Sequence, residues 1–234
     1  SIVALVFLAV AGNEKRAAAG LTRQNWKSAV LIVLAFVGIY IVRTVVSVAV
    51  QGVSDGSGMQ YVKEWAAMFK NPMMWLNIAA LPINYFFVFI AFFGEEYGWR
   101  YYLQPVLQKR FGLRAGVIIL GVVWGLWHIP DDLFYYTQTS GIQMIFAQQI
   151  TCISLGIFFA YAYMKTQNIW VPVCLHYLNN NLIPIISGTF SADVLENQTV
   201  SWKDLPVALV LNGLCFGFFL LADVFKKKEV QEEE

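Results

Sequence analysis

Six long apolar runs decide what this chain of 234 residues can fold into. A helix that spans a bilayer needs roughly 20 mostly apolar residues. The runs that approach or reach this length are Ser28–Val50, Met73–Phe93, Ala115–Ile129, Ile142–Met164, Ile169–Ser187 and Leu205–Val224. Because backbone groups that face lipid must be paired within their own segment, such runs form helices. They predict an all-α fold, a polytopic membrane helix bundle of about 6–8 transmembrane helices.

A seventh apolar stretch, Ile2–Gly12, lies at the start of the chain. It is too short to span as it stands, and the chain begins at Ser1 rather than at a methionine. We therefore expect the beginning of this helix to be missing. No repeat or low-complexity tract divides the sequence, so we expect residues 1–234 to form a single integral membrane domain.

The composition agrees with a protein that lives in a bilayer. Hydrophobic residues make up 58% of the chain. Charged residues make up 13%, about half of their share in soluble domains. The net charge of +1 provides no basic surface, so no nucleic-acid partner is expected. The three cysteines, Cys152, Cys174 and Cys215, lie in apolar runs without metal-ligand spacing, so we interpret them as packing residues.

The basic residues predict which loops face the cytoplasm. If residues 13–27 are cytoplasmic, the cytoplasmic segments hold twelve basic residues: Lys15, Arg16, Arg23, Lys27, Arg100, Lys109, Arg110, Arg114, Lys165, Lys226, Lys227 and Lys228. The opposite side holds three: Lys63, Lys70 and Lys203. This asymmetry follows the positive-inside rule. The short loops and small size favour the plasma membrane of a bacterium.

Several ionisable and amide side chains fall within or beside the apolar spans: Arg43, Glu95, Glu96, Arg100, His128, His176, and the run of three asparagines at 179–181. A charge near the bilayer centre is costly and is usually buried in protein for a functional reason. The only two histidines of the chain are both in this set. One such histidine is most often a packed side chain, but two of them with two glutamates favour a site. We expect Arg43 to snorkel or to pair inside the bundle.

Helical rise brings these groups to similar depth. We expect the helix with Glu95 to end before Pro105, which disfavours helix at the residue before it. Glu95 then lies about 13–15 Å from the basic side, His128 roughly 21 Å and His176 about 10 Å. These depths predict a site open toward the cytoplasm. We place Asp131 and Asp132 in an exterior loop.

The spacing within each helix refines the site. Glu96 and Arg100 are four residues apart, which predicts an ion pair that leaves Glu95 free. His176 and Asn180 share one face of their helix by the same spacing, while Asn179 and Asn181 face neighbouring helices.

The set of residue types favours hydrolysis by an activated water. No GxSxG or HExxH motif is present, which argues against a serine hydrolase of that type and against a zincin. A glutamate near a histidine can deprotonate water, and an asparagine with a second histidine can donate hydrogen bonds to an oxyanion.

Three stretches resemble the CAAX-processing and bacteriocin-processing (CPBP) family of intramembrane proteases, which includes type II CAAX prenyl endopeptidases. GEEYGWR carries an EExxxR pattern, GVVWGLWHIP ends a helix in a histidine, and IWVPVCLHYLNN carries HxxxN. The resemblance covers residues 92–183, the expected core. The chain departs from the family at Trp124, where the family often has phenylalanine.

The resemblance implies a role for each matching residue. Glu95 would be the general base on a water, assisted by His128. Glu96 and Arg100 would complete the first motif, with Arg100 structural, while His176 and Asn180 would stabilise the oxyanion. The family is often described as metalloproteases, and Glu95, Glu96, His128 and His176 are candidate ligands for a divalent metal such as zinc. A mechanism without metal fits the sequence equally well.

The leading hypothesis is an intramembrane endopeptidase that cleaves a membrane-associated protein or peptide near its C-terminus or at a juxtamembrane site. Its expected partners are the lipid bilayer and that substrate. Two alternatives stay open: a non-proteolytic immunity or scaffold protein that binds a peptide through the same cavity, and a transporter that uses the carboxylates and histidines as a relay. The residues do not separate a prenylated protein from a bacteriocin leader or a signalling peptide.

Overall fold

The computed structural model describes residues 13–188 and 191–226, and the stretch Ile2–Gly12 lies outside them. The described residues form helices and contain no strand. In chain order the α-helices are α2 (Asn13–Ala18), α3 (Trp26–Ser54), α4 (Gln60–Met68), α5 (Pro72–Glu96), α6 (Gln104–Phe111), α7 (Leu113–Trp127), α8 (Ile129–Phe134), α9 (Gly141–Thr166), α10 (Trp170–Ser187), α11 (Ala192–Glu196) and α12 (Asp204–Cys215). A π-helix, η1 (Tyr97–Leu103), joins α5 to α6, and two 3₁₀ segments, η2 (Gly217–Leu221) and η3 (Asp223–Phe225), follow α12. The predicted all-α bundle is confirmed.

Four described helical segments are long and apolar enough to cross a membrane: residues 26–54, 72–111, 113–134 and 141–166. The other two predicted spans are shorter or more polar. The first is α10, with 18 residues that include His176 and three asparagines. The second is α12, which has 12 residues before the chain tightens into 3₁₀ turns. By this measure the described residues provide fewer spans than the predicted 6–8.

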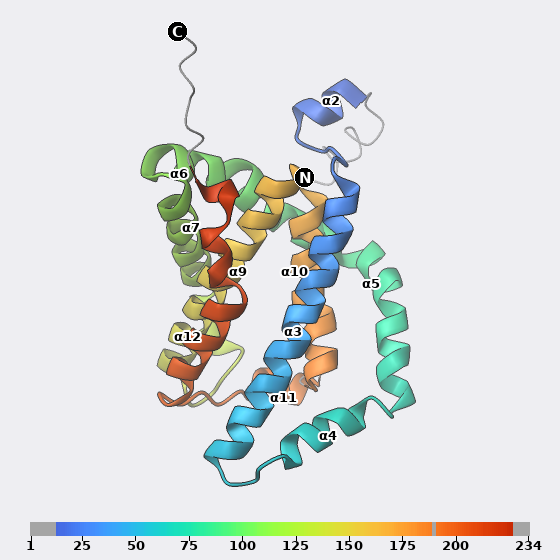
Figure 1. The fold of residues 1–234 in the computed structure, drawn as a ribbon, viewed down its shortest axis with the longest axis vertical. Helices are drawn as coiled ribbons and strands as arrows, with labels where there is room; N and C mark the ends of the chain where they lie inside the picture. The colour runs from blue at the N-terminus through green and yellow to red at the C-terminus, as the bar shows by residue number, and fades with distance from the viewer. Residues whose placement is uncertain (1–12, 189–190, 227–234) are drawn as a thin grey trace.

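The two ends of the bundle differ in charge as predicted. Figure 1 shows α2 and α6, which carry four lysines and arginines, at one end, and α4 and α11 at the opposite end. We call the end with α2 and α6 the basic end. By the positive-inside rule, this is the end that the sequence predicts to face the cytoplasm.

Helix α9 is the centre of the bundle and packs against α3, α7, α8, α10 and α12. A glycine permits its closest approach to α7. A Cβ on Gly121 would lie 2.6 Å from the Cα of Ile153 in α9, so only a residue without a side chain fits.

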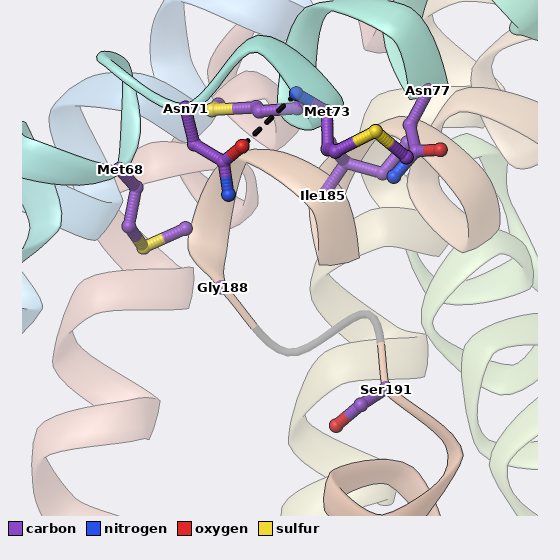
Figure 2. Close-up of a pocket in the computed structure, with 8 residues that line it drawn as sticks. Met68, Asn71, Met73, Asn77, Ile185, Gly188 and Ser191 are labelled. Carbon is purple, nitrogen blue, oxygen red and sulfur yellow. Dashed lines mark hydrogen bonds between the residues drawn. The ribbon is translucent and has the colours of Figure 1, made fainter.

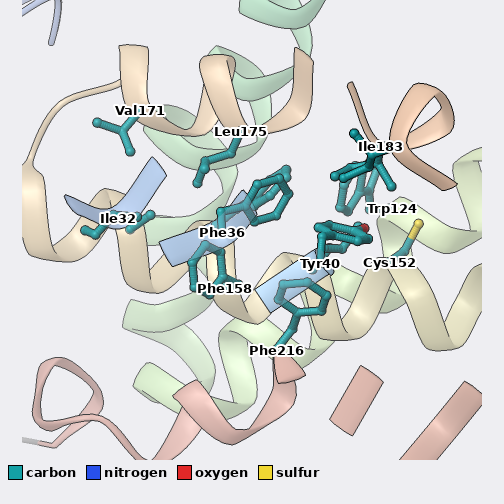
Figure 3. Close-up of a cluster of buried hydrophobic side chains, with 14 of the residues drawn as sticks. Ile32, Phe36, Tyr40, Trp124, Cys152, Phe158, Val171, Leu175, Ile183 and Phe216 are labelled. Carbon is teal, nitrogen blue, oxygen red and sulfur yellow. The ribbon is translucent and has the colours of Figure 1, made fainter. Parts of the chain in front are cut away.

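The main core lies between α3, α9, α10 and the C-terminal segment (Figure 3). Phe36 of α3 is fully buried at its centre. Its ring lies 5.0 Å from that of Tyr40, 5.6 Å from that of Phe158 and 5.8 Å from that of Phe216. These contacts fix α3 against the helices that carry the polar residues.

Helix α5 begins with two local signals. Asn71 caps it by accepting a hydrogen bond from the backbone N–H of Met73, and Pro72 occupies the first turn, where proline has no N–H to lose. The sequence predicts that this helix ends before Pro105, and this prediction is wrong, because the helical segment continues to Phe111. Its hydrogen bonding widens into the π-helix η1, and α6 then starts at Gln104 with Pro105 in its first turn, where proline is tolerated.

Candidate active site

The first motif forms a buried ion pair at the junction of α5 and η1. Glu96 and Arg100 are both fully buried, and Arg100 Nε donates to Glu96 Oε2 at 2.8 Å. Arg100 Nη1 also donates to the carbonyl of Gly156 in α9, at 3.0 Å. The guanidinium lies over the rings of Trp124 and Phe159, each at 5.5 Å. The arginine therefore ties η1 to α7 and α9 while it balances the charge of Glu96.

The second oxygen of Glu96 binds the second histidine. His176 Nδ1 lies 2.9 Å from Glu96 Oε1, and its ring packs edge-on against Trp124 at 5.4 Å. With Nδ1–H donating to the carboxylate, Nε2 is the ring nitrogen that stays available. The first and third motifs are thus joined directly.

The first histidine caps the end of α7. His128 Nδ1 lies 2.8 Å from the carbonyl oxygen of Trp124, one turn earlier, and 3.8 Å from the sulfur of Cys152 in α9. The rings of Trp124 and His128 are 5.8 Å apart, as their spacing predicts. The indole of Trp124 therefore lies between the two imidazoles and contacts both.

Both histidines line one cavity of about 350 Å³. Its lining also includes Trp124, Tyr135, Tyr136, Met144, Gln148, Thr151, Cys152, Leu155, Asn179, Asn180, Pro184, Leu195 and Gln198. Asn180 is exposed within it, one turn after His176 on α10. Three of the predicted site residues, His128, His176 and Asn180, thus meet at one cavity.

The cavity does not open where the sequence predicts. Its lining includes Leu195 of α11, and Figure 1 shows α11 at the end opposite the basic end. The predicted opening toward the cytoplasm is therefore wrong for this cavity. The reason is that His128 ends α7, so the residues around it belong to the far end of the bundle.

Glu95 precedes Glu96 of the buried ion pair, in the last turn of α5. Its Oε2 is buried and has no hydrogen-bond partner among the described residues. A buried acceptor without a partner is costly unless a water or a substrate group binds it. Glu95 is therefore free of the ion pair, as the spacing predicts.

The ionisable side chains of the cavity lining are two histidines, one cysteine and two tyrosines. None of the lining residues is a lysine, arginine, aspartate or glutamate. Burial raises the pKa of Tyr136 to about 12, so its hydroxyl stays protonated at neutral pH.

The residues that could ligate a metal do not form a metal site in this arrangement. No group of three or more histidine, cysteine or carboxylate side chains within the described ranges lies close enough to hold a metal ion. Both oxygens of Glu96 are already bound, by Arg100 and His176. The predicted ligand set of Glu95, Glu96, His128 and His176 therefore does not fit a metal as these side chains stand.

A second cavity is a weaker candidate. It lies where α4 and the start of α5 meet the end of α10 (Figure 2), and it is lined by Met68, Asn71, Met73, Met74, Asn77, Ile185, Gly188 and Ser191. These residues include no ionisable side chain, so the cavity has no group for acid–base chemistry.

The structure adds residues that the sequence does not single out for the site. Tyr40 of α3 donates to Asn179, and Cys152 contacts His128; an apolar helix gives no sign of either contact. Asp132, predicted in an exterior loop, is fully buried in α8, and neither of its carboxylate oxygens has a partner among the described residues. Its neighbour Asp131 is exposed.

The chain is an integral, multi-pass membrane protein with a buried cluster of carboxylate, guanidinium and imidazole groups. Residues 75–182 match the family model of the type II CAAX prenyl endopeptidase Rce1-like proteins. The chain is also 27% identical over 125 residues to CAAX prenyl protease 2 of Methanococcus maripaludis. That match covers 50% of this chain and 45% of the relative, so it spans less than half of the relative's length. No solved structure matches the chain.

Residues 75–182 are therefore similar to the type II CAAX prenyl endopeptidases of the CPBP family. The match includes all three motifs and confirms the resemblance drawn from them.

Proposed function

We propose that this protein is an intramembrane endopeptidase that hydrolyses a peptide bond of a membrane-associated protein or peptide. The observation that carries the proposal is the meeting of His128, His176 and Asn180 at one cavity, beside the buried Glu96–Arg100 pair. The family match of residues 75–182 supports the same class of reaction. We further propose that residues 1–234 act as one unit whose reacting groups lie within 92–183.

In the proposed reaction a water attacks the substrate carbonyl. Glu95, whose Oε2 has no partner among the described residues, takes one proton from the water with the assistance of His128. The water oxygen bonds to the carbonyl carbon, and the electron pair of the C=O bond moves to its oxygen. When the tetrahedral intermediate collapses, the C–N bond breaks. The proton held by Glu95 passes to the leaving nitrogen, which gives one carboxylic acid and one amine.

His176 and Asn180 have the second role in the proposal. With Nδ1–H donating to Glu96, His176 would donate from Nε2–H in its imidazolium form, and this bond and one from the Asn180 amide would stabilise the negative oxygen of the intermediate. Glu96 holds Nδ1 of His176, which orients the ring for this contact. Arg100 keeps Glu96 in place from the opposite side, so its role is structural.

A lining without lysine, arginine, aspartate or glutamate supports a substrate segment without charged side chains, held in extended form between aromatic and amide groups. The lining provides no lysine or arginine to pair with a free C-terminal carboxylate. Cleavage at an internal, juxtamembrane bond fits this chemistry better than recognition of a chain end. The short loops and the basic end fit a small protein of a bacterial plasma membrane, which is where we propose that it acts.

The test is cleavage by the purified protein in detergent or proteoliposomes. The peptides that the native protein releases from a membrane fraction containing its substrates are compared with those that the Glu95→Ala and His128→Ala variants release. Both variants should lose cleavage while they keep the native melting temperature. Glu64→Ala, which removes an exposed glutamate of α4 outside the cavity, is the matched control. Full activity of Glu95→Ala would overturn the proposal.

The same experiment addresses the remaining alternatives. Parallel reactions with a chelator, and with zinc added back, report whether a metal is required. If cells with Glu95→Ala keep the phenotype of the native protein, a non-proteolytic immunity or scaffold role replaces the protease.

A further inference from the structure

A chain of two hydrogen bonds connects Tyr40 of α3 to Asn180, the proposed oxyanion donor. The hydroxyl of Tyr40 donates to Asn179 Oδ1, and Asn179 Nδ2 donates to Asn180 Oδ1 at 2.8 Å. These two bonds lead from the buried core into the cavity that Asn179 and Asn180 line.

The direction of these bonds determines which end of the Asn180 amide is free. An asparagine side chain has one acceptor oxygen and two donor hydrogens on its nitrogen. In Asn180 the oxygen is bound by Asn179, so the side-chain nitrogen is the group left to donate. A free amide could turn either end toward a substrate, and an oxygen turned toward an oxyanion would repel it.

We propose that Tyr40 and Asn179 are positioning residues that orient the amide of Asn180 so that its N–H groups face the reacting carbonyl. This inference rests on the proposed protease function. It assigns a role in the reaction to a helix, α3, that lies outside the residues matched by the family model.

The environment of Tyr40 is suited to holding a fixed orientation. Its ring is 5% exposed and lies edge-on to Phe36 at 5.0 Å. Arg43 lies over the same ring at 5.7 Å, and its Nε donates to Asn212 Oδ1 at 3.0 Å. A hydroxyl held this way needs no reorganisation when charge develops, which is the property that makes an oxyanion donor effective.

The first test is the kinetics of Tyr40→Phe, which removes the hydroxyl and keeps the ring. We expect kcat to fall about three- to tenfold, the value of one neutral hydrogen bond, with KM unchanged. Asn179→Ala should lower kcat at least as much. Tyr177→Phe is the matched control, because this buried tyrosine donates to Leu81 and Asn84 of α5 instead. Its kcat should stay native.

A double-mutant cycle separates positioning from general stability. If Tyr40 acts through Asn180, then Tyr40→Phe should cause no further loss of kcat in the Asn180→Ala protein. Equal losses in both backgrounds would overturn the inference, as would a native kcat in Tyr40→Phe.

A second measurement does not depend on activity. Protein labelled with ¹⁵N-asparagine in detergent gives side-chain amide NMR signals, which Asn179→Asp and Asn180→Asp variants assign. Tyr40→Phe should shift the Asn179 and Asn180 signals, while Tyr177→Phe should leave them unchanged. An unshifted Asn180 signal in Tyr40→Phe would refute the orientation. If the native protein cleaves nothing, the proposed function fails, and the NMR result still decides whether Tyr40 orients Asn180.

Discussion

Glu96 and His176 lie 80 residues apart in the chain and meet at 2.9 Å in the middle of the bundle. The other oxygen of Glu96 is held by Arg100. The carboxylate of Glu96 is thus bound by Arg100 from η1 and by His176 from α10. This contact, more than any other, connects the first motif to the third.

The arrangement predicts that Arg100 is essential for folding. Arg100→Ala leaves Glu96 buried without its counter-charge, and breaking a buried ion pair from one side costs about 3–5 kcal/mol. We expect a marked fall in the melting temperature in detergent, measured by differential scanning fluorimetry. Activity should be lost along with the fold.

A surface pair provides the control for Arg100. Lys226 and Asp223 form an ion pair at 2.7 Å in which both side chains are largely exposed. Lys226→Ala should leave the melting temperature unchanged, since exposed pairs contribute little. A native melting temperature in Arg100→Ala would show that the buried pair is dispensable.

The close approach of α7 and α9 predicts a strong effect at Gly121. An alanine there would place its Cβ 2.6 Å from the Cα of Ile153, and backbone cannot move aside as a flexible side chain can. Gly121→Ala should therefore force the helices apart, displace Cys152 from His128, and lower both the melting temperature and kcat. Thermal unfolding and cleavage assays on the same preparation measure the two effects.

Gly38 of α3 is the matched control, because a Cβ there meets nothing within 4 Å. Alanine at an exposed helix position is favoured over glycine by about 1 kcal/mol. Gly38→Ala should keep or raise the melting temperature and retain full cleavage. If Gly121→Ala and Gly38→Ala have the same melting temperature and cleavage activity, the close approach of α7 and α9 at Gly121 is not needed for stability or activity.

The helices were largely predictable because apolar runs and capping residues act locally. Asn71, Pro72 and the run after them mark the start of α5 with no help from the rest of the fold. The π-helix after Glu96 was not predictable; within it Arg100 donates to the carbonyl of Gly156 in α9, a partner 56 residues away in the chain. The end of α12 at Cys215, where 3₁₀ turns follow, was likewise not predicted.

The site was partly predictable for the same reason. The Glu96–Arg100 and Trp124–His128 contacts follow from a spacing of four residues, and both are observed. The bond that Tyr40 donates to Asn179 joins different helices, as predicted for Asn179, although the sequence could not name the partner. The amide of Asn181 bonds within its own helix, to the carbonyl of Tyr177, which makes that part of the prediction wrong. Arg43 pairs inside the bundle, with Asn212.

Trp124 differs from the phenylalanine that the family often has, and its contacts predict a mild effect of that exchange. The indole Nε1 is buried without a partner among the described residues, so Trp124→Phe removes an unsatisfied donor. The smaller ring can still pack against His176 and the guanidinium of Arg100. We expect Trp124→Phe to keep cleavage within a few-fold of native and Trp124→Ala to lose it. A large loss of kcat in Trp124→Phe, with its melting temperature retained, would show that the N–H contacts the substrate or its water.

Phe36 lies one helical turn before Tyr40, and its burial predicts that the core supports the site. Replacing a buried phenylalanine by alanine leaves a cavity and costs about 3–5 kcal/mol. Phe36→Ala should therefore lower the melting temperature strongly and release the ring of Tyr40 that it packs against at 5.0 Å. Phe87 of α5 is 73% exposed and is the matched control, since its loss leaves no internal cavity. If Phe36→Ala and Phe87→Ala melt at the same temperature, this core does not fix α3. The hydroxyl of Tyr40 would then lack a rigid support from which to orient the Asn180 amide.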